Sequence, residues 1–415
     1  MNTRTDTASL DTASITSTGN GSGARLPYAA RILFGLLRGI EGGMLTVNGP
    51  GGFTQTFGHT VPAVRITLGD WDVLKACLKS GDIGFAETWM AGRWQCDNLP
   101  ALIELFCRNR SAMDGAVYGS WWGNLLYRAR HLLNRNTRTG AKKNIEAHYD
   151  LGNDFYRLWL DQSMTYSSAL FGGDTSLTLQ QAQRAKYRCV LRQLQVKPGD
   201  RILEIGCGWG GFAEVAASEA GAHVTGITLS SEQLAWARVR LERAGLGAQA
   251  DLRLTDYRDF NGRFDHIVSI EMFEAVGEAY WDTYFAAIKR NLAPGGHAVI
   301  QTITIDEALF ARYRTSTDFI QQYIFPGGML PSPAEFRARA AAAGLTAVEG
   351  VRFGRDYAET LKRWRAGFMA ALPAVREQGF SARFIRLWEF YLGYCEGAFN
   401  AGSTSVIQFE LHHAD

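Results

Sequence analysis

The sequence contains no long hydrophobic run. No stretch approaches the roughly 18 consecutive apolar residues that a membrane-spanning helix needs. Residues 1–24 are rich in Ser, Thr and Gly and include no apolar segment. We therefore expect a disordered tail there, and not a secretory signal.

Paired cysteines and a strong net charge are also missing. The six cysteines show no C-x-x-C spacing, which argues against a disulfide framework, and no metal site is predicted. The formal net charge is only +2, yet residues 128–145 hold six Arg and Lys side chains and no acid. This segment is either a solvated linker or a contact for anionic phosphates of lipid or nucleic acid.

No internal repeat is present, and the basic segment is the best domain boundary. Before it, residues 42–58 suggest a hairpin with glycine-rich turns, and residues 70–90 and 97–109 suggest amphipathic helices. After it, apolar strands alternate with helices, which predicts an α/β fold with a Rossmann-like parallel sheet and helices on both faces. The expected strands are 201–206, 223–228, 251–256, 264–270 and 297–305, with 405–413 joining the sheet edge.

A glycine turn follows the first of these strands, in "EIGCGWGGF". Gly206, Gly208 and Gly211 match G-x-G-x-x-G, a pattern that lets the backbone approach a nucleotide closely. A dinucleotide site usually also has an acid at the end of the second strand. Here that position is Thr228, and the next acid, Glu232, falls inside a helix. The turn alone therefore leaves the nucleotide open.

The stretch "SIEMFEAVG", residues 269–277, places two glutamates among Met, Phe, Ala and Val side chains. A carboxyl group in apolar surroundings has a raised pKa, which is typical of catalytic groups. Glu274 is either such a group or an acid favoured by a helix N-terminus. Glu271 is expected to fill that helix-capping role.

Six motifs, in order, resemble the cyclopropane-fatty-acyl-phospholipid synthases. They are "HYDLGNDFYRLWLDQSMTYSSALF", "LEIGCGWGGFA", "GITLSSEQ", "FDHIVSIEMFEAVG", "YIFPGGMLPS" and "FGRDYAETLKRW". The resemblance runs from about residue 80 to the end of the chain. It implies transfer of a methylene from S-adenosylmethionine (SAM) to the cis double bond of a phospholipid acyl chain.

The resemblance also implies an organisation of the chain. Residues 25–127 would form a smaller, lipid-contacting α+β domain, 128–145 a basic linker, and 146–415 the SAM-dependent catalytic domain. The aromatic-rich segments 355–372 and 384–399 would form core and an acyl-chain tunnel. A homodimer in the cytoplasm, peripheral on the inner face of the membrane, is implied, with unsaturated phospholipids and no nucleic acid as partners.

Site residues follow from the same resemblance. The cofactor would be held by Tyr149, Tyr166, Ser167, Gly206, Gly208, Thr228 and Gln233. A bound bicarbonate would take the proton that must leave before the ring closes, held by Glu274, Tyr357, Gln301 and the backbone amides of Ser168 and Ile303. Ordinary core packing is the alternative for the three tyrosines.

Three positions depart from the common bacterial pattern. Ser168 replaces a cysteine, Ala275 replaces the histidine of "FEHVG", and Gln301 replaces a strand histidine. Gln301 can donate to an anion but cannot carry charge or relay a proton. These changes resemble plant-type members and leave the product open, with 10-methyl, 10-methylene or furan-precursor chains as alternatives to cyclopropane.

Two other classes compete with a lipid-modifying enzyme. A non-enzymatic SAM- or lipid-binding protein would not need Glu274, Tyr357 and the full cofactor set. A nucleic-acid methyltransferase would explain the basic segment, but it needs polar, stacking side chains where this chain has Phe273, Ala275 and Val276.

Overall fold

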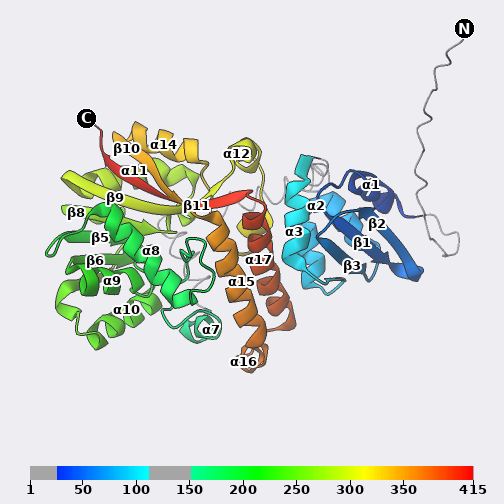
Figure 1. Ribbon diagram of the computed structural model, residues 1–415, viewed down its shortest axis with the longest axis horizontal. Coiled ribbons are helices and arrows are strands. Elements are labelled where there is room, and N and C mark those ends of the chain that lie inside the picture. Colours follow the sequence, from blue (N-terminus) through cyan, green and yellow to red (C-terminus); the bar gives the residue numbers. More distant parts are fainter. Residues whose placement is uncertain (1–25, 112–150, 415) are drawn as a thin grey trace, which may run out of the picture.

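The computed structural model describes residues 26–111 and 151–414 (Figure 1). The predicted tail, the basic linker and Tyr149 lie outside these ranges. Two sheets organise the described residues, one of four strands and one of seven. None of the described helices has the length and apolar character required to cross a membrane.

The first sheet has the strand order β2-β1-β3-β4. Its first two strands pair antiparallel around a glycine-rich turn, which confirms the predicted hairpin. Asn98 caps α3 by accepting a hydrogen bond from the Ala101 amide at 3.2 Å. The elements are α1 Tyr28–Leu37, β1 Met44–Gly49, β2 Phe53–Gly58, β3 Ala63–Leu68, α2 Asp72–Met90, β4 Trp94–Cys96 and α3 Leu99–Arg108.

The second sheet has the order β10-β11-β9-β8-β5-β6-β7, and β9, β8, β5, β6 and β7 run parallel. The α/β prediction is confirmed. The bounds are β5 Arg201–Ile205, β6 His223–Thr228, β7 Ala250–Leu254, β8 Phe264–Ile270, β9 Leu292–Ile305, β10 Leu345–Arg352 and β11 Thr404–His413.

The last strand does not lie at the sheet edge, contrary to the prediction. β11 pairs antiparallel with β9 on one side and with β10 on the other. β10 escapes a sequence reading because Ala347 and Glu349 occupy its less exposed positions after Leu345, and a bulge at Gly350 interrupts its register. As a result β11 is buried inside the sheet, and its side chains reach the centre of the molecule.

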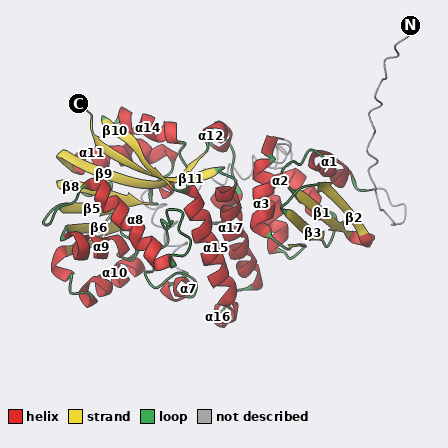
Figure 2. Ribbon diagram, in the orientation of Figure 1, coloured by secondary structure: helices red, strands yellow, loops and turns green. Residues whose placement is uncertain are grey.

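Helices cover both faces of this sheet, because neighbouring strand residues point to opposite sides. Ile202 packs with one layer of helices, and Leu203 with the other. Ser230 caps α10 by accepting a hydrogen bond from the Gln233 amide. One layer comprises α8 Leu179–Leu194, α9 Gly211–Ala220 and α10 Ser231–Arg243; the other comprises α11 Trp281–Asn291 and α14 Pro333–Ala342 (Figure 2).

Two long helices connect the sheets. α15 (Gly354–Ala370) packs against α17 (Ala382–Asn400), and α17 packs against α2 and α3 (Figure 1). Their aromatic side chains form one core cluster with those of the first sheet, as the sequence predicts for most of them. The shorter helices are α7 Asn153–Arg157, α12 Glu307–Tyr313, α13 Phe319–Tyr323 and α16 Leu372–Glu377, with 3-10 turns at Pro50–Gly52, Gly247–Gln249, Phe273–Ala275 and Glu278–Tyr280.

Candidate active site

The glycine turn opens a crevice at the carboxyl ends of β5, β6 and β8. The φ angles are +86° at Gly206, +49° at Gly208 and +78° at Gly210, all in the left-handed region that favours glycine. The amides of Gly206 and Cys207 both donate to the Ile227 carbonyl, at 2.9 and 3.0 Å. A Cβ at Gly208 would meet no atom within 4 Å and would project into open space. The backbone is therefore exposed to a ligand.

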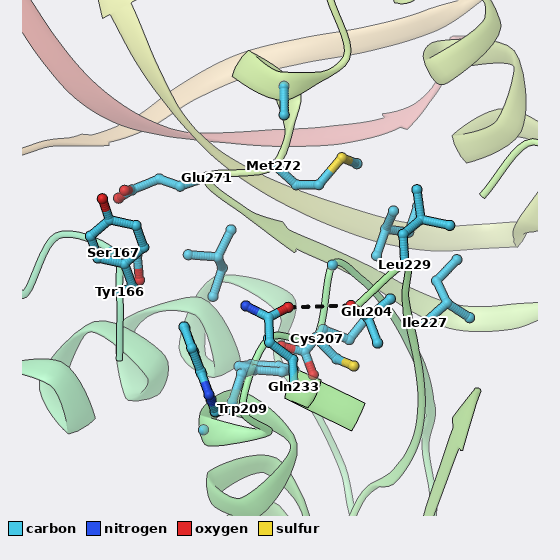
Figure 3. A pocket seen from close by; sticks show the side chains of 18 of the residues that line it. Tyr166, Ser167, Glu204, Cys207, Trp209, Ile227, Leu229, Gln233, Glu271 and Met272 are labelled. Atoms are coloured by element: carbon cyan, nitrogen blue, oxygen red, sulfur yellow. Dashed lines mark hydrogen bonds between the residues drawn. The ribbon is translucent and has the colours of Figure 1, made fainter. Parts of the chain in front are cut away.

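Five predicted cofactor residues besides Gly208 line this crevice: Tyr166, Ser167, Gly206, Thr228 and Gln233. The Thr228 hydroxyl donates to Gln233 Oε1 at 3.3 Å, which fixes the Gln233 side chain (Figure 3). Figure 3 shows Glu271 and Met272 on the opposite side of the crevice from Cys207, Trp209 and Gln233. The crevice combines an open glycine backbone with amide and hydroxyl groups and an apolar wall. This combination fits a nucleoside with a sulfonium side chain, such as SAM.

A second, mostly apolar cavity meets the crevice. Three residues line both spaces: Tyr166, Glu271 and Ala275. The second cavity runs between the end of β9, helices α13, α15 and α17, and residues near Asp82 at the first sheet. Its apolar lining includes Ile303, Ile320, Phe325, Met329, Leu361 and Phe399. A ligand in the crevice and an apolar chain in the cavity would therefore meet beside Glu271.

Glu271 directly follows β8 and has a φ of +50°, unusual for a residue other than glycine. Its amide donates to the Gln301 carbonyl at 2.8 Å. Three donors converge on its carboxylate: the Ser168 amide at 2.8 Å, Gln301 Nε2 at 2.7 Å and the Tyr357 hydroxyl at 2.7 Å. The turn at Glu271 thus directs a partly buried carboxylate, which lines both cavities, into a prepared set of donors.

A chain of glutamines orients Gln301. Gln408 Nε2 donates to Gln301 Oε1 at 3.0 Å, and Gln193 Nε2 donates in turn to Gln408 Oε1. Because its oxygen is taken, Gln301 presents its amino group to Glu271. Gln301 and Gln408 are fully buried, so this orientation is not exchanged with solvent.

Glu274 lies beside this cluster but has different partners. Its Oε1 accepts hydrogen bonds from Thr302 Oγ1, at 3.0 Å, and from the Ile303 amide. Its Oε2 is buried and has no hydrogen-bond partner among the described residues. Burial first, and then the charge of Glu271, raise the pKa of Glu274 to about 8. Glu274 is therefore protonated at neutral pH.

Lys186 is a fully buried amine close to the site. It donates to Ser167 Oγ at 2.5 Å and to Gln183 Oε1 at 2.7 Å. Burial lowers the pKa of Lys186 to about 7, although Glu271 opposes the shift. Burial also raises the pKa of Glu271, against the charge of Lys186 and the three hydrogen bonds. Lys186 thus favours the ionised form of Glu271.

The predicted anion site is divided in two. Sequence reasoning placed Glu274 with Ser168, Gln301, Tyr357 and Ile303, but only the Ile303 amide contacts Glu274. The other three bind Glu271. The helix-capping role expected of Glu271 is wrong, because Met272 precedes the 3-10 turn and no side chain caps it. Its position at the carboxyl end of β8, where such sheets bind ligands, was the available signal.

The same contacts test the predicted bicarbonate. Every group assigned to hold that anion already donates to a glutamate of this chain. A bicarbonate would also add a second anion beside Glu271 in a buried setting, where like charges repel strongly. The residues present therefore do not fit a bound bicarbonate, and the prediction is corrected on this point.

Comparison with known proteins gives consistent matches. Residues 136–409 match the family model described as mycolic acid cyclopropane synthetase. The tuberculostearic acid methyltransferase of Mycobacterium tuberculosis is 38% identical, over 80% of this chain and 79% of the relative. The cyclopropane-fatty-acyl-phospholipid synthase of Escherichia coli is 37% identical, over 81% of this chain and 85% of the relative.

Solved structures agree with the sequence matches. The mycolic acid cyclopropane synthase CmaA1, complexed with SAH and CTAB, superposes with a TM-score of 0.61 at 33% identity. That match covers 65% of this chain and 97% of the other. The cyclopropane synthase MmaA2 from Mycobacterium tuberculosis gives a TM-score of 0.60 at 32% identity, with the same coverage.

Proposed function

Because the chain belongs to the mycolic acid cyclopropane synthetase family and is a SAM-dependent methyltransferase, we propose that it forms cyclopropane rings on phospholipid acyl chains. The acceptor would be a cis double bond in an unsaturated chain. The observation that carries this proposal is the junction of the two cavities at Tyr166, Glu271 and Ala275. It would bring a crevice for the methyl donor against an apolar space for the chain.

The residues of the two cavities suit this chemistry. When bound, SAM supplies an electrophilic methyl carbon: its C–S bond breaks as the alkene forms a C–C bond to that carbon, which leaves a cation on the other alkene carbon. Gly206, Gly208, Thr228 and Gln233 would hold the donor, with Tyr166 and Ser167 at the side that faces the chain. Tyr149 remains a further predicted contact.

The apolar cavity would protect and stabilise the cation. Ile303, Met329 and Leu361 line it with side chains that offer no hydrogen bond to water, which would trap the cation as an alcohol. The rings of Phe325, Tyr391 and Phe399 also line it, and aromatic faces attract positive charge. Tyr166 donates to or accepts from Tyr391 at 2.7 Å, which holds both rings at the junction.

The direct test is an assay with methyl-labelled SAM and vesicles of monounsaturated phospholipid, followed by mass spectrometry of the acyl chains. We expect a labelled chain heavier by one CH2 that resists mild hydrogenation, as a ring does. A product that takes up hydrogen would be a methylene chain, and a saturated product heavier by CH3 and H a methyl branch. Either would replace cyclopropane as the product, and an unlabelled lipid fraction would refute the proposal.

We further propose that a homodimer acts at the cytoplasmic surface of the membrane. Support comes from the sequence of residues 128–145, whose six cations and lack of acids suit anionic head groups. Binding to anionic vesicles should weaken with salt, because exposed charges are screened over about 10 Å at 0.1 M ionic strength. Co-sedimentation with neutral and anionic vesicles tests this, and equal binding to both at every salt concentration would contradict it.

A further inference from the structure

The proposed reaction needs a base inside the protein. After the methyl group is added, one proton must leave it before the ring can close. The base must lie at the junction of crevice and cavity, where that methyl group forms. Of the described carboxyl groups, Glu271 alone lines both spaces.

The surroundings of Glu271 fix its carboxylate and, against the effect of burial, favour its ionised form. Oε1 accepts from the Ser168 amide and from Gln301, and Oε2 accepts from Tyr357. Each oxygen of a carboxylate can accept two hydrogen bonds, so Oε2 has one position left. The cation of Lys186 lies close enough to oppose the raised pKa of Glu271. A carboxylate held by three donors, with one acceptor position left on Oε2, has the geometry of a proton acceptor.

Glu274 cannot take the same role in this arrangement. Its raised pKa, about 8, keeps it protonated at neutral pH, and the charge of Glu271 contributes to that shift. The two neighbouring carboxyl groups thus have different partners: three donors and Lys186 favour the ionised form of Glu271, whereas burial and the charge of Glu271 favour the neutral form of Glu274. Glu274 lines the apolar cavity and not the crevice, and because it is neutral it adds no charge to the path of the chain.

We propose that Glu271 is a catalytic residue, the built-in base that takes the proton from the added methyl group. The proposal rests on the proposed function. The Glu271 carboxylate binds the proton, and the electron pair of the broken C–H bond forms the second C–C bond of the ring. That bond removes the charge of the cation. The protonated carboxyl returns its proton to water when the product leaves, so no bicarbonate is required.

Gln301, Gln408 and Tyr357 are positioning residues in this scheme. Gln301 cannot relay a proton, but its oriented amino group holds one oxygen of Glu271. Tyr357 holds the other and lowers the pKa of Glu271. Removing that hydrogen bond with Tyr357→Phe should therefore move the acidic limb of the kcat–pH profile to higher pH, an effect that a packing role alone would not produce.

The main test compares three proteins in bicarbonate-free buffer with labelled SAM and unsaturated phospholipid vesicles. Glu271→Gln should lose at least about 100-fold in kcat, the usual contribution of a general base, while calorimetry shows unchanged SAM binding. Glu278→Gln is the matched control. It lies seven residues along the chain, pairs with Arg314 at the surface, and should keep wild-type turnover.

Glu271→Gly gives an independent readout. Glycine suits the φ of +50°, so the backbone should keep its shape while the three donors lose their carboxylate. Added bicarbonate or formate should then restore part of the turnover of this variant and leave the wild type unchanged.

Two results would overturn the inference. One is a wild-type enzyme that stops in bicarbonate-free buffer and recovers when bicarbonate is added. The other is a Glu271→Gln variant within about threefold of the wild type, well below the usual effect of losing a base. In both cases the wild type still modifies lipid, so the proposed function stands. Wild-type protein that labels no lipid under any buffer would instead refute the proposed function.

Discussion

The two cavities of this protein are built in opposite ways. The crevice is formed by short turns at the carboxyl ends of neighbouring parallel strands, with exposed backbone at Gly206 and Gly208. The apolar cavity is lined by side chains from segments far apart in the sequence. The first is Asp82, near the first sheet, and the last is Thr404, at the start of β11. Backbone geometry would therefore serve the methyl donor and packing of distant helices the proposed acyl chain, so changes in the two regions should have separable effects.

The largest effect is expected from a change in the crevice. In Gly208→Val the new side chain would enter space that is now open, at a φ that disfavours a β-branched residue. We expect SAM to bind at least about 100-fold more weakly, a loss of about 2.7 kcal/mol. Isothermal titration calorimetry measures this directly.

Gly245→Val is the control for backbone strain. Gly245 has a φ of +72° and open surroundings but does not line the crevice. Gly245→Val should lose about as much stability as Gly208→Val, about 1–2 kcal/mol for a left-handed residue with a side chain. It should still bind SAM normally. Equal loss of SAM binding in both variants would contradict the role of the glycine turn.

A smaller effect is expected from filling the apolar cavity. Ala398 lines it from α17, so Ala398→Phe would shorten the space for a chain. We expect turnover of long-chain phospholipid to fall about tenfold, on the order of one or two lost methylene contacts, with SAM binding unchanged. Assays with a series of acyl chain lengths measure it.

Ala382→Phe, on the exposed first turn of the same helix, is the control. Its turnover should depend on acyl chain length as that of the wild type does. Thermal unfolding would show whether the larger side chain at position 398 also strains the core, since overpacking typically costs about 1–3 kcal/mol. A variant at 398 that handles every chain length as the wild type does would show that the chain lies elsewhere.

The smallest effect at neutral pH is expected at the junction, from Glu274→Gln. Since the pKa of Glu274 is about 8, the wild-type side chain is neutral there and glutamine resembles it. Turnover of the variant at pH 7 should stay within about threefold of the wild type. That is well below the tenfold change that corresponds to one pKa unit. As pH rises through about 8 the wild type gains a second charge beside Glu271 and should slow, whereas the variant should not.

Stability gives a second measurement of the same group. The folded-state pKa of Glu274 is raised above its usual 4.5, so the folded protein holds the proton more tightly than the unfolded chain does. The free energy of unfolding should therefore decrease between pH 4.5 and 8 in the wild type, and less so in Glu274→Gln. Identical pH profiles for the two proteins would show that folding does not raise the pKa of Glu274.

The contrast between the cavities also explains what could be predicted from sequence. Strand alternation and the glycine turn are local patterns, so β5, β6, β8 and the crevice around Gly206 could be located in advance. The place of β11 could not, because it depends on a partner strand, β10, with weak patterning.

Glu271 escaped prediction for a related reason. Its donors come from Ser168, Gln301 and Tyr357, positions separated along the chain by 103, 30 and 86 residues from Glu271. Its left-handed backbone is imposed by the surrounding structure, since no local preference favours it. A sequence places two glutamates at the end of a strand, but tertiary contacts decide which one the donors reach.

The chain of glutamines has a consequence for how the protein is made. Gln408 is added to the growing chain 107 residues after Gln301, whose amide it orients. Until β11 inserts between β9 and β10, a nascent chain can already hold a complete glycine turn while Gln301 lacks the partner that fixes its amino group. All residues that line the crevice precede residue 277, whereas the arrangement that orients Gln301 needs a residue of β11.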